Sequence, residues 1–398
     1  MIVRQLRPDE NIKCSMLQST AFNYSYNAEE HKEDKLSEEV WGAFLDDGET
    51  LMSVMCTITY RSRFGGCYLP ALGIGGVATY PQYRRSGGIR AIFRKVFSMA
   101  PERGWAISYL YPFSFDYYRQ FGYERVLRRK EMKFDCSMLE RLPRNTNAVL
   151  YENTAQQGIL LDIYRRFSAQ LNLIFDRPED GRVYREYSAD PHKSLRYTYI
   201  WSDDAGHPEA YATCSIRNEY LCISELCYTS PEALYGILGF LRMYDGQVKG
   251  YHFTDLPENT PLEYLMGNYW NVDYTLDSFA MGRVLLPETL FRTYDYPDGD
   301  GAFTIAVCDD AAPHLCRGTY AVSFSGGHGS CEKISEQTEP QADLVLNTPV
   351  LSRLLLGSET LTTASARYIP GVEIRCDERA GAFFRAFTRR SGHIYTRF

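Results

Sequence analysis

The stretch VATYPQYRRSGGIRAIF, residues 77–93, constrains the fold more than any other part of the chain. It opens with small and β-branched residues, which favour a strand, and then crosses a proline, two arginines and two glycines. Beyond the glycines, the apolar residues recur at helical spacing: Ile89, Ile92, Phe93, Val96 and Phe97. The pattern therefore predicts a strand, a glycine-centred connector and an α-helix that ends near residue 100.

Such a connector predicts an anion site. Backbone N–H groups at the start of a helix have no partner within the helix, and that end of the helix is positive, so it attracts phosphate. Gly87 and Gly88 allow a close approach to the backbone, and Arg84, Arg85 and Arg90 add positive charge. The spacing matches neither GxxxxGK[ST] nor GxGxxG, so a pyrophosphate at this turn is the expected ligand. The alternative is a solvated basic face at a helix start.

Length and charge limit the class of protein. The chain has 398 residues, which is room for two or three domains. Its formal net charge of -7 argues against nucleic-acid binding, including the stacking of single strands on its many tyrosines and phenylalanines. The N-terminus, MIVRQLRPDE, lacks the apolar segment of a signal peptide, and no run approaches the roughly 18–20 apolar residues of a membrane span. We therefore expect a cytoplasmic protein without a nucleic-acid or membrane partner.

The 11 cysteines and 7 histidines form no metal-binding motif. The sequence contains no CxxC pair and no HxxxH or HExxH pair. We expect reduced, mostly buried thiols and no bound metal. Cys67 is the cysteine closest to the connector, and we do not expect it to act as a nucleophile.

The pattern of strands and helices divides the chain into three regions. In residues 1–145, WGAFLDDGETLMSVMCTITYRSRF predicts two strands joined by a turn, and glycines near the centre of YLPALGIGGVATY predict a bulge or a close backbone approach. An amphipathic stretch lies at Asn11–Phe22 and a charged one at Glu29–Glu39. FDYYRQFGYERV predicts a short helix, a C-terminal glycine and a strand.

The second and third regions repeat strand and helix signals without the arginine–glycine connector. RYTYIWSDD, EAYATCSIRN and YLCISELCYT predict three strands, and TSPE before ALYGILGFLRMY predicts a capped helix. After a connector at Tyr294–Gly301, GAFTIAVCDD, GTYAVSFSGG and ADLVLNTPVLSRLLLG predict strands and then an amphipathic helix. This last region, of about 110 residues, has the size of a domain.

At the connector the residues resemble motif A of the GNAT N-acetyltransferases. The resemblance implies that the strand at Val77, Ala78 and Thr79 binds the pantetheine arm of acetyl-CoA. It implies that the turn binds the pyrophosphate, through Arg84, Arg85, Ser86, Gly87, Gly88, Ile89 and Arg90. Ile89 departs from the small residue usual at its position.

Further segments resemble the enhanced intracellular survival (Eis) branch of that family. They are LYPFSFDYYRQFGYE at residues 110–124, SELCYTSPEALYGILGFL, FAMGRV and ADLVLNTPVLSRLLLGS, and the likeness covers nearly the whole chain. The resemblance implies an α+β fold of two tandem GNAT-like mixed-sheet domains and a C-terminal sterol-carrier-protein-like domain. The implied domains are 1–145, 146–288 and 289–398, with no cofactor in the second because it lacks the turn.

The resemblance also assigns catalytic roles. It makes Tyr118, in the pattern YxxFGY, the proton donor to the departing thiolate, and it places Phe113 and Ser114 beside acetyl-CoA. A phenol with a pKa near 10 is protonated at pH 7 and can donate. The alternative for Tyr118 is a packing role, since the chain has 31 tyrosines. The α-carboxylate of Phe398 is the implied base, and a frayed terminus is the alternative.

Together these features predict an acetyl-CoA-dependent N-acetyltransferase that works by direct attack in a ternary complex. The alternative is a non-catalytic binding protein whose C-terminal module carries an apolar ligand. The acceptor would be a small-molecule or peptide amine. Arg397 lies next to the implied base and disfavours polycationic aminoglycosides by charge repulsion. The resemblance implies that an acidic segment borders the substrate groove, and its carboxylates could offset that repulsion: Glu29, Glu30, Glu33 and Asp34. The resemblance further implies a homo-oligomer, with a hexameric ring as the candidate assembly.

Overall fold

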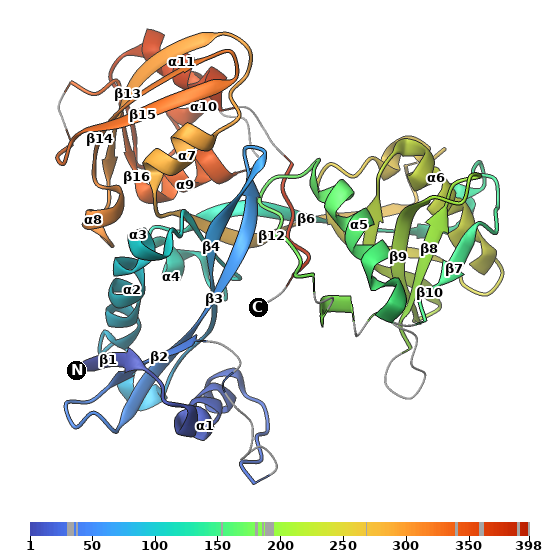
Figure 1. Ribbon diagram of the computed structural model, residues 1–398, viewed down its shortest axis with the longest axis horizontal. Coiled ribbons are helices and arrows are strands. Elements are labelled where there is room, and N and C mark those ends of the chain that lie inside the picture. Colours follow the sequence, from blue (N-terminus) through green and yellow to red (C-terminus); the bar gives the residue numbers. More distant parts are fainter. Residues whose placement is uncertain are drawn as a thin grey trace. The chain divides into compact units, whose positions relative to one another are not determined.

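The chain folds into two compact units (Figure 1). The first contains residues 1–126 and 280–389, and the second contains residues 127–279 and 390–397. The computed structural model describes residues 1–29, 36, 39–152, 154–179, 182–184, 187, 195–267, 269–338, 341–357, 362–387 and 391–396. None of the described helices is long and apolar enough to cross a membrane.

The N-terminal part of the first unit is a mixed sheet. Its strands, in spatial order, are β1 (Ile2–Gln5), β2 (Glu39–Phe44), β3 (Leu51–Phe64), β4 (Cys67–Thr79), β5 (Ile107–Leu110) and the last residues of β12 (Val272–Val284). Neighbouring strands are antiparallel except β4 and β5, which are parallel. The two strands expected on either side of the Asp-Asp-Gly-Glu turn are confirmed as β2 and β3. The charged segment at residues 29–39 lies mostly outside the described residues.

Helices cover both faces of this sheet. α1 (Asn11–Phe22) packs with Leu17 against Val54 of β3. α2 (Gly88–Ser98) begins against Ser53, which points to the opposite face because side chains alternate along a strand. The predicted helix after the connector is thus confirmed, and its apolar stripe is buried. Two short helices follow, α3 (Ala100–Arg103) and α4 (Phe115–Arg119).

The C-terminal part of the first unit, orange in Figure 1, is a separate five-stranded sheet with helices packed against it. Its strands, in spatial order, are β15 (His328–Ser335), β14 (Gly318–Ser325), β13 (Asp300–Cys308), β16 (Leu344–Asn347) and β17 (Val372–Ile374). Its helices are α7 (Pro287–Thr293), α8 (Pro313–Cys316), α9 (Thr348–Leu356), α10 (Thr363–Ala366) and α11 (Asp377–Ala386). The expected strands and amphipathic helix of this region are confirmed.

A buried arginine ties the two parts of the first unit together. Arg283 of β12 is fully buried, and its Nη2 lies 2.7 Å from the Asp309 carboxylate of the C-terminal part. Its guanidinium also donates to the Phe121 carbonyl and lies 4.5 Å from the centre of the Phe97 ring, both in the N-terminal part. Removing one partner of such a pair leaves an uncompensated charge, so this contact fixes how the two parts pack.

The second unit repeats the plan of the N-terminal sheet. Its strands, in spatial order, are β6 (Glu124–Asp135), β11 (Gly250–Pro257), β10 (Tyr220–Tyr228), β9 (Pro208–Arg217), β8 (Tyr197–Ser202) and β7 (Ala148–Leu150). Among the described strands of this sheet, β10 and β11 form the one parallel pair, as β4 and β5 do in the first unit. α5 (Gln157–Ser168) and α6 (Pro231–Leu241) cover two separate apolar clusters. The three predicted strands and the capped helix are confirmed.

Candidate active site

In the first unit, two parallel strands separate where the connector begins. The pairing of β4 with β5 ends at Ile74 opposite Leu110, while β4 continues to Thr79. Against β3, the register of β4 shifts between residues 75 and 78, so that Gly76 and Val77 together face Met55. This is a β-bulge, as the glycines of this strand predicted. Because the pairing with β5 ends at Ile74, the strand end at residues 77–79 is paired with β3 but not with β5.

The bulge depends on glycine and on α1. Gly76 has a φ of +56°, in the left-handed region that favours glycine. A Cβ at Gly76 would lie 2.4 Å from the amide nitrogen of Gln18 and 2.8 Å from the sulfur of Cys56. Gln18 Nε2 also donates to the Gly76 carbonyl at 3.4 Å. Gln18 was not among the predicted site residues, because nothing local in the sequence connects α1 to this strand.

The connector leaves the start of α2 uncapped. After the 3-10 turn Pro81–Tyr83, Arg85 and Gly87 have φ values of +64° and +87°, and α2 begins at Gly88. No side chain in the described part of the chain caps the first turn of this helix. In the second unit, by contrast, the Ser230 hydroxyl caps α6 by accepting from the Ala233 N–H at 3.1 Å. The start of α2 combines the missing side-chain cap with flanking arginines and has no acid in its first turn, which fits an anion site.

The two glycines of the connector are required for different structural reasons. Gly87 is exposed, and a Cβ added there would meet no described neighbour within 4 Å. Glycine is favoured at this position because of its positive φ. Gly88 is buried, and a Cβ there would lie 2.6 Å from the Ser53 hydroxyl oxygen. Gly88 thus allows α2 to approach β3, whereas the sequence suggested that both glycines make room for a phosphate.

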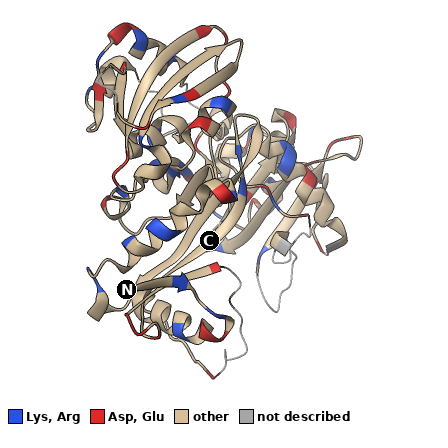
Figure 2. Cartoon of the chain, turned by 60° about the vertical axis from the view of Figure 1, so that its left-hand side comes forward, with Lys and Arg blue, Asp and Glu red and all other residues tan. Residues whose placement is uncertain are grey.

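The arginines of the connector reach into solvent. Arg84, Arg85 and Arg90 are exposed, as is Ser86, whose hydroxyl donates to the Tyr83 carbonyl at 2.5 Å. In Figure 2, Lys and Arg are blue and Asp and Glu are red, and residues of both signs are spread over the chain. Exposed guanidinium groups beside free backbone donors can pair with phosphate oxygens in two-pronged contacts.

Contacts bring the start of α2 next to the segment that carries Tyr118. Arg90 donates to the Gln120 side-chain oxygen at 2.9 Å. One turn further, the ring of Phe93 stacks on Phe121 at 4.3 Å. The predicted anion site and the predicted proton donor therefore belong to one locality of the first unit.

Tyr118 itself is held by aromatic rings. Its side chain is 3% exposed and lies edge-on to Phe113 at 5.4 Å and to Tyr117 at 5.1 Å between ring centres. Burial raises the pKa of Tyr118 above its usual value near 10, so the phenol is protonated at neutral pH. Among the residues that the structure describes, none hydrogen-bonds to the Tyr118 hydroxyl. The group is thus a protonated donor, and no described residue accepts its proton.

The other two predicted contact residues lie beside Tyr118. Phe113 is 72% exposed and rests on the Tyr117 ring at 5.1 Å. Ser114 caps α4, since its hydroxyl accepts from the Tyr117 N–H at 3.3 Å. Ser114 therefore has a local structural role in addition to the predicted one.

The C-terminal tail is ordered in the second unit. Asn172 donates its N–H to the Ser391 carbonyl at 2.7 Å, and Tyr395 donates its hydroxyl to the Leu226 carbonyl at 3.1 Å. His393 and Ile394 are fully buried. Residues 391–396 are therefore held by contacts, whereas the alternative of a frayed terminus concerns Phe398 and stays untested. Residues 397 and 398 lie outside the described residues, as do Glu30, Glu33 and Asp34, while Glu29 is exposed.

No disulfide joins any of the 11 cysteines, all of which lie among the described residues. Six of them are buried: Cys14, Cys56, Cys214, Cys227, Cys316 and Cys331. In the described part of the chain, no group of three or more His, Cys, Asp or Glu side chains could hold a metal ion.

Comparison with protein families gives three matches along the chain. Residues 2–126 and 174–284 each match a family described as an acetyltransferase (GNAT) domain. Residues 287–378 match the sterol carrier protein domain family. The two acetyltransferase matches together span more than half of the chain. A search among curated proteins finds no significant match.

Solved structures share the fold over the full chain. A probable N-acyltransferase from Enterococcus faecalis V583 superposes on 100% of this chain and 99% of its own, with a TM-score of 0.84 and 22% identity. For a GCN5-related N-acetyltransferase from Anabaena variabilis, the coverage is 100% of both chains, the TM-score 0.82 and the identity 17%. For Eis1 from Mycobacterium abscessus, the coverage is again 100% of both, with a TM-score of 0.81 and 19% identity.

Proposed function

Since the chain belongs to the GNAT N-acetyltransferases, with two GNAT domains and a C-terminal sterol-carrier-protein domain, we propose that its first GNAT domain uses acetyl-CoA to acetylate an amine. The proposed domains are 1–145, 146–288 and 289–398, and the second binds no acetyl-CoA. One observation carries the proposal. The uncapped, arginine-flanked start of α2 follows the end of β4 that is not paired with β5, and it contacts the segment that carries Tyr118.

In the proposed binding mode each part of the site has one task. The backbone of Val77, Ala78 and Thr79 binds the pantetheine arm, because β4 has no pairing with β5 there. The turn from Arg84 to Arg90 binds the pyrophosphate through backbone N–H groups and guanidinium groups. Phe113 and Ser114 lie on the other side of the thioester.

The proposed chemistry is direct attack of the amine on the thioester carbonyl. A backbone N–H at the bulge near Val77 stabilises the oxyanion, and Tyr118 donates its proton to the departing thiolate. The amine must lose a proton, and the α-carboxylate of Phe398 takes it. That carboxylate has an ordinary pKa of about 3.3–3.7, so it needs burial or a bridging water to act as a base near pH 7. We propose that the acceptor is a small-molecule or peptide amine and that the protein forms a homo-oligomer.

The test separates the pyrophosphate contact from the chemistry. Replacing Arg84 by Ala should weaken acetyl-CoA binding about ten-fold or more in calorimetry, because a charge-assisted hydrogen bond contributes roughly 1.5–3 kcal/mol. Acetylation of an amine panel by the acetyl thioester of N-acetylcysteamine, which has no pyrophosphate, should be unchanged. Arg94, exposed further along α2, provides the matched control. Equal acetyl-CoA affinity in Arg84→Ala and Arg94→Ala would contradict the proposed site.

A further inference from the structure

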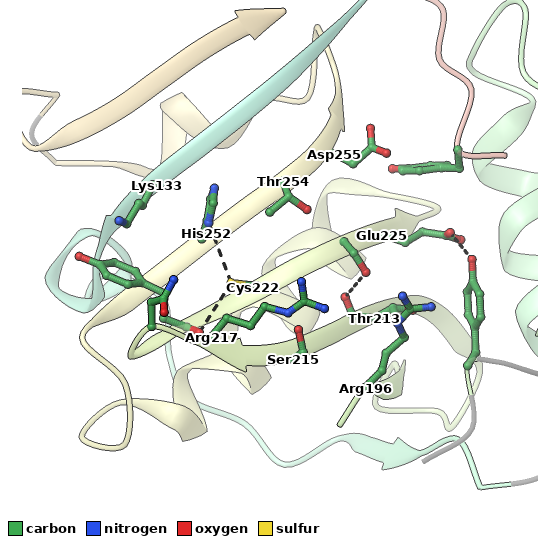
Figure 3. Close-up of a pocket in the computed structure, with 15 residues that line it drawn as sticks. Lys133, Arg196, Thr213, Ser215, Arg217, Cys222, Glu225, His252, Thr254 and Asp255 are labelled. Atoms are coloured by element: carbon green, nitrogen blue, oxygen red, sulfur yellow. Dashed lines mark hydrogen bonds between the residues drawn. The ribbon is translucent and has the colours of Figure 1, made fainter. Parts of the chain in front are cut away.

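The second unit contains a cavity on the polar face of its sheet (Figure 3). It measures about 560 Å³, and its floor includes Lys133, Arg217, Cys222 and His252. These residues come from β6, β9, β10 and β11. The apolar residues that alternate with them face α6 on the other side of the sheet. A cavity of this volume is the usual size for a small-molecule ligand.

Three side chains in this locality contact one another in series: Cys222, His252 and Glu131. Cys222 and His252 are direct neighbours in the parallel pair of β10 and β11, and the Cys222 sulfur lies 3.9 Å from His252 Nδ1 (Figure 3). On the other side of the imidazole, His252 Nε2 lies 2.5 Å from a Glu131 carboxylate oxygen. Glu131 and Lys133 share one face of β6, and Lys133 is the residue opposite His252. The imidazole therefore lies between a thiol and a carboxylate.

This geometry is that of a nucleophile, a base and a group that orients the base. With its Nε2–H donated to Glu131, the imidazole presents Nδ1 as an acceptor to the thiol. Burial raises the pKa of the Cys222 thiol, and Arg217 and Lys133 oppose that shift. The thiol is thus protonated at rest and needs a base when it attacks. Two acids also line the cavity: Glu225, which is paired with buried Arg177 at 2.7 Å, and Asp255, whose carboxylate lies 3.1 Å from His393 Nε2.

The charges around the thiol indicate what kind of molecule it would meet. Lys133 and Arg217 line the cavity on either side of Cys222, and Arg196 lines it as well. Lys133 lies 4.1 Å from the centre of the Tyr220 ring, which holds its ammonium group over the floor. Cations that surround a nucleophile favour a substrate with a carboxylate.

We propose that the second GNAT domain carries a separate thiol site, in which Cys222 is acylated by a small thioester that bears a carboxylate. The Cys222 sulfur forms a bond to the acyl carbon, and its proton passes to His252 Nδ1. The bond between the acyl carbon and the donor sulfur breaks, and the proton then passes from His252 to the departing thiolate. The products are an acyl-Cys222 thioester and a free thiol, so no oxidant or reductant is needed. This site is independent of the proposed acetyl-CoA site.

Alkylation tests the thiol and its charge environment in the full-length protein. Iodoacetate carries a carboxylate and iodoacetamide does not, so the ratio of their rates at Cys222 should exceed the ratio at exposed Cys67 at least ten-fold. Peptide mapping measures both cysteines in the same molecule. Arg217→Ala should lower the ratio at Cys222 and leave Cys67 unchanged. Equal ratios at the two cysteines, or an unreactive Cys222, would overturn the proposal.

Variants of His252 and Glu131 test the role of the base and the role of the carboxylate that orients it. His252→Gln should slow alkylation of Cys222 at least ten-fold, and added imidazole should restore it, which a merely structural histidine would not do. Glu131→Gln keeps an acceptor for His252 and should retain reactivity, whereas Glu131→Leu should lose it. Half-buried Cys136, whose thiol faces the Val248 carbonyl, is the control for unfolding. Unchanged reactivity in His252→Gln would also overturn the proposal.

The acyl step is tested with succinyl and acetyl thioesters of N-acetylcysteamine. The succinyl compound should acylate Cys222 at least ten-fold faster than the acetyl compound, as read by mass spectrometry of the intact chain, and Cys222→Ser should abolish the adduct. An equal rate for both compounds, or an adduct that persists in Cys222→Ser, would show that the cavity does not select an anionic acyl group.

Discussion

At the scale of single residues, Tyr118 is the group on which the proposed chemistry depends most. Its phenol is buried, and its raised pKa keeps it protonated across neutral and mildly alkaline pH. Tyr118→Phe removes only the hydroxyl and keeps the ring contacts with Phe113 and Tyr117. We expect kcat to fall on the order of 10²–10⁴-fold, the usual contribution of a general acid, while acetyl-CoA affinity stays the same. Release of free CoA and calorimetry measure the two quantities.

Tyr117 is the matched control for this prediction. It precedes Tyr118, is half-buried, and contacts the same Phe113 ring. Tyr117→Phe should leave kcat within a few-fold of the original chain. If Tyr118→Phe turns over at the unaltered rate, Tyr118 is a packing residue and the proton donor lies elsewhere.

Gly88 is the residue that sets the distance between α2 and β3. A Cβ at Gly88 would lie 2.6 Å from Ser53 Oγ, closer than atoms pack without displacement. We expect Gly88→Ala to lower the free energy of unfolding by about 1–3 kcal/mol, the usual cost of overpacking. Urea unfolding measures the change, and the added substitution Ser53→Ala should recover part of it. Gly158 of α5 is the control, because a Cβ added there would meet no described neighbour within 4 Å, and Gly158→Ala should be neutral or stabilising.

At the scale of elements, the two GNAT domains start the corresponding helix in opposite ways. α6 has the Ser230 cap, whereas α2 has none. Ser230→Ala should therefore lower the free energy of unfolding by about 1 kcal/mol without a change in acetyl-CoA affinity. A loss of acetyl-CoA affinity in this variant, measured by calorimetry, would contradict the assignment of the cofactor to α2 alone.

The elements themselves follow from local signals in the sequence. The stripe from Ile89 to Phe97 predicts α2, and Ser230 with the following proline predicts the start of α6. The bulge in β4 is also foreseen from its glycines, although the left-handed backbone of Gly76 and its contact with Gln18 are not. That contact joins residues 58 positions apart, and no periodic pattern carries such information.

At the scale of the whole molecule, the sequence predicts three regions, but not that the first and third form one compact unit. Buried Arg283 is one residue that joins them, since its partner Asp309 and its neighbour Phe97 come from different regions. A single arginine in a strand looks unremarkable in the sequence. The cavity in the second unit was missed for the same reason, since Cys222, His252 and Glu131 lie on three strands. The only available signal was the polar alternation along those strands.

The C-terminal tail leads to the terminal carboxylate that we propose as the base. Residues 391–396 are anchored by Asn172 and by the hydroxyl of Tyr395. One Gly added after Phe398 moves the terminal carboxylate by about 3.3–3.6 Å. If that carboxylate is the base, kcat should fall on the order of 10²–10⁴-fold, with acetyl-CoA affinity and thermal unfolding unchanged.

The control for the tail changes the side chain and keeps the carboxylate. Phe398→Leu should retain most of the activity, because the proposed base is the backbone carboxylate and not the ring. CoA release at matched folded fractions compares the two variants with the original chain. If the extended chain turns over normally, the amine loses its proton to another group, while the roles proposed for the α2 turn and Tyr118 stand on their own tests. If Phe398→Leu alone is inactive, the ring rather than the carboxylate supports catalysis.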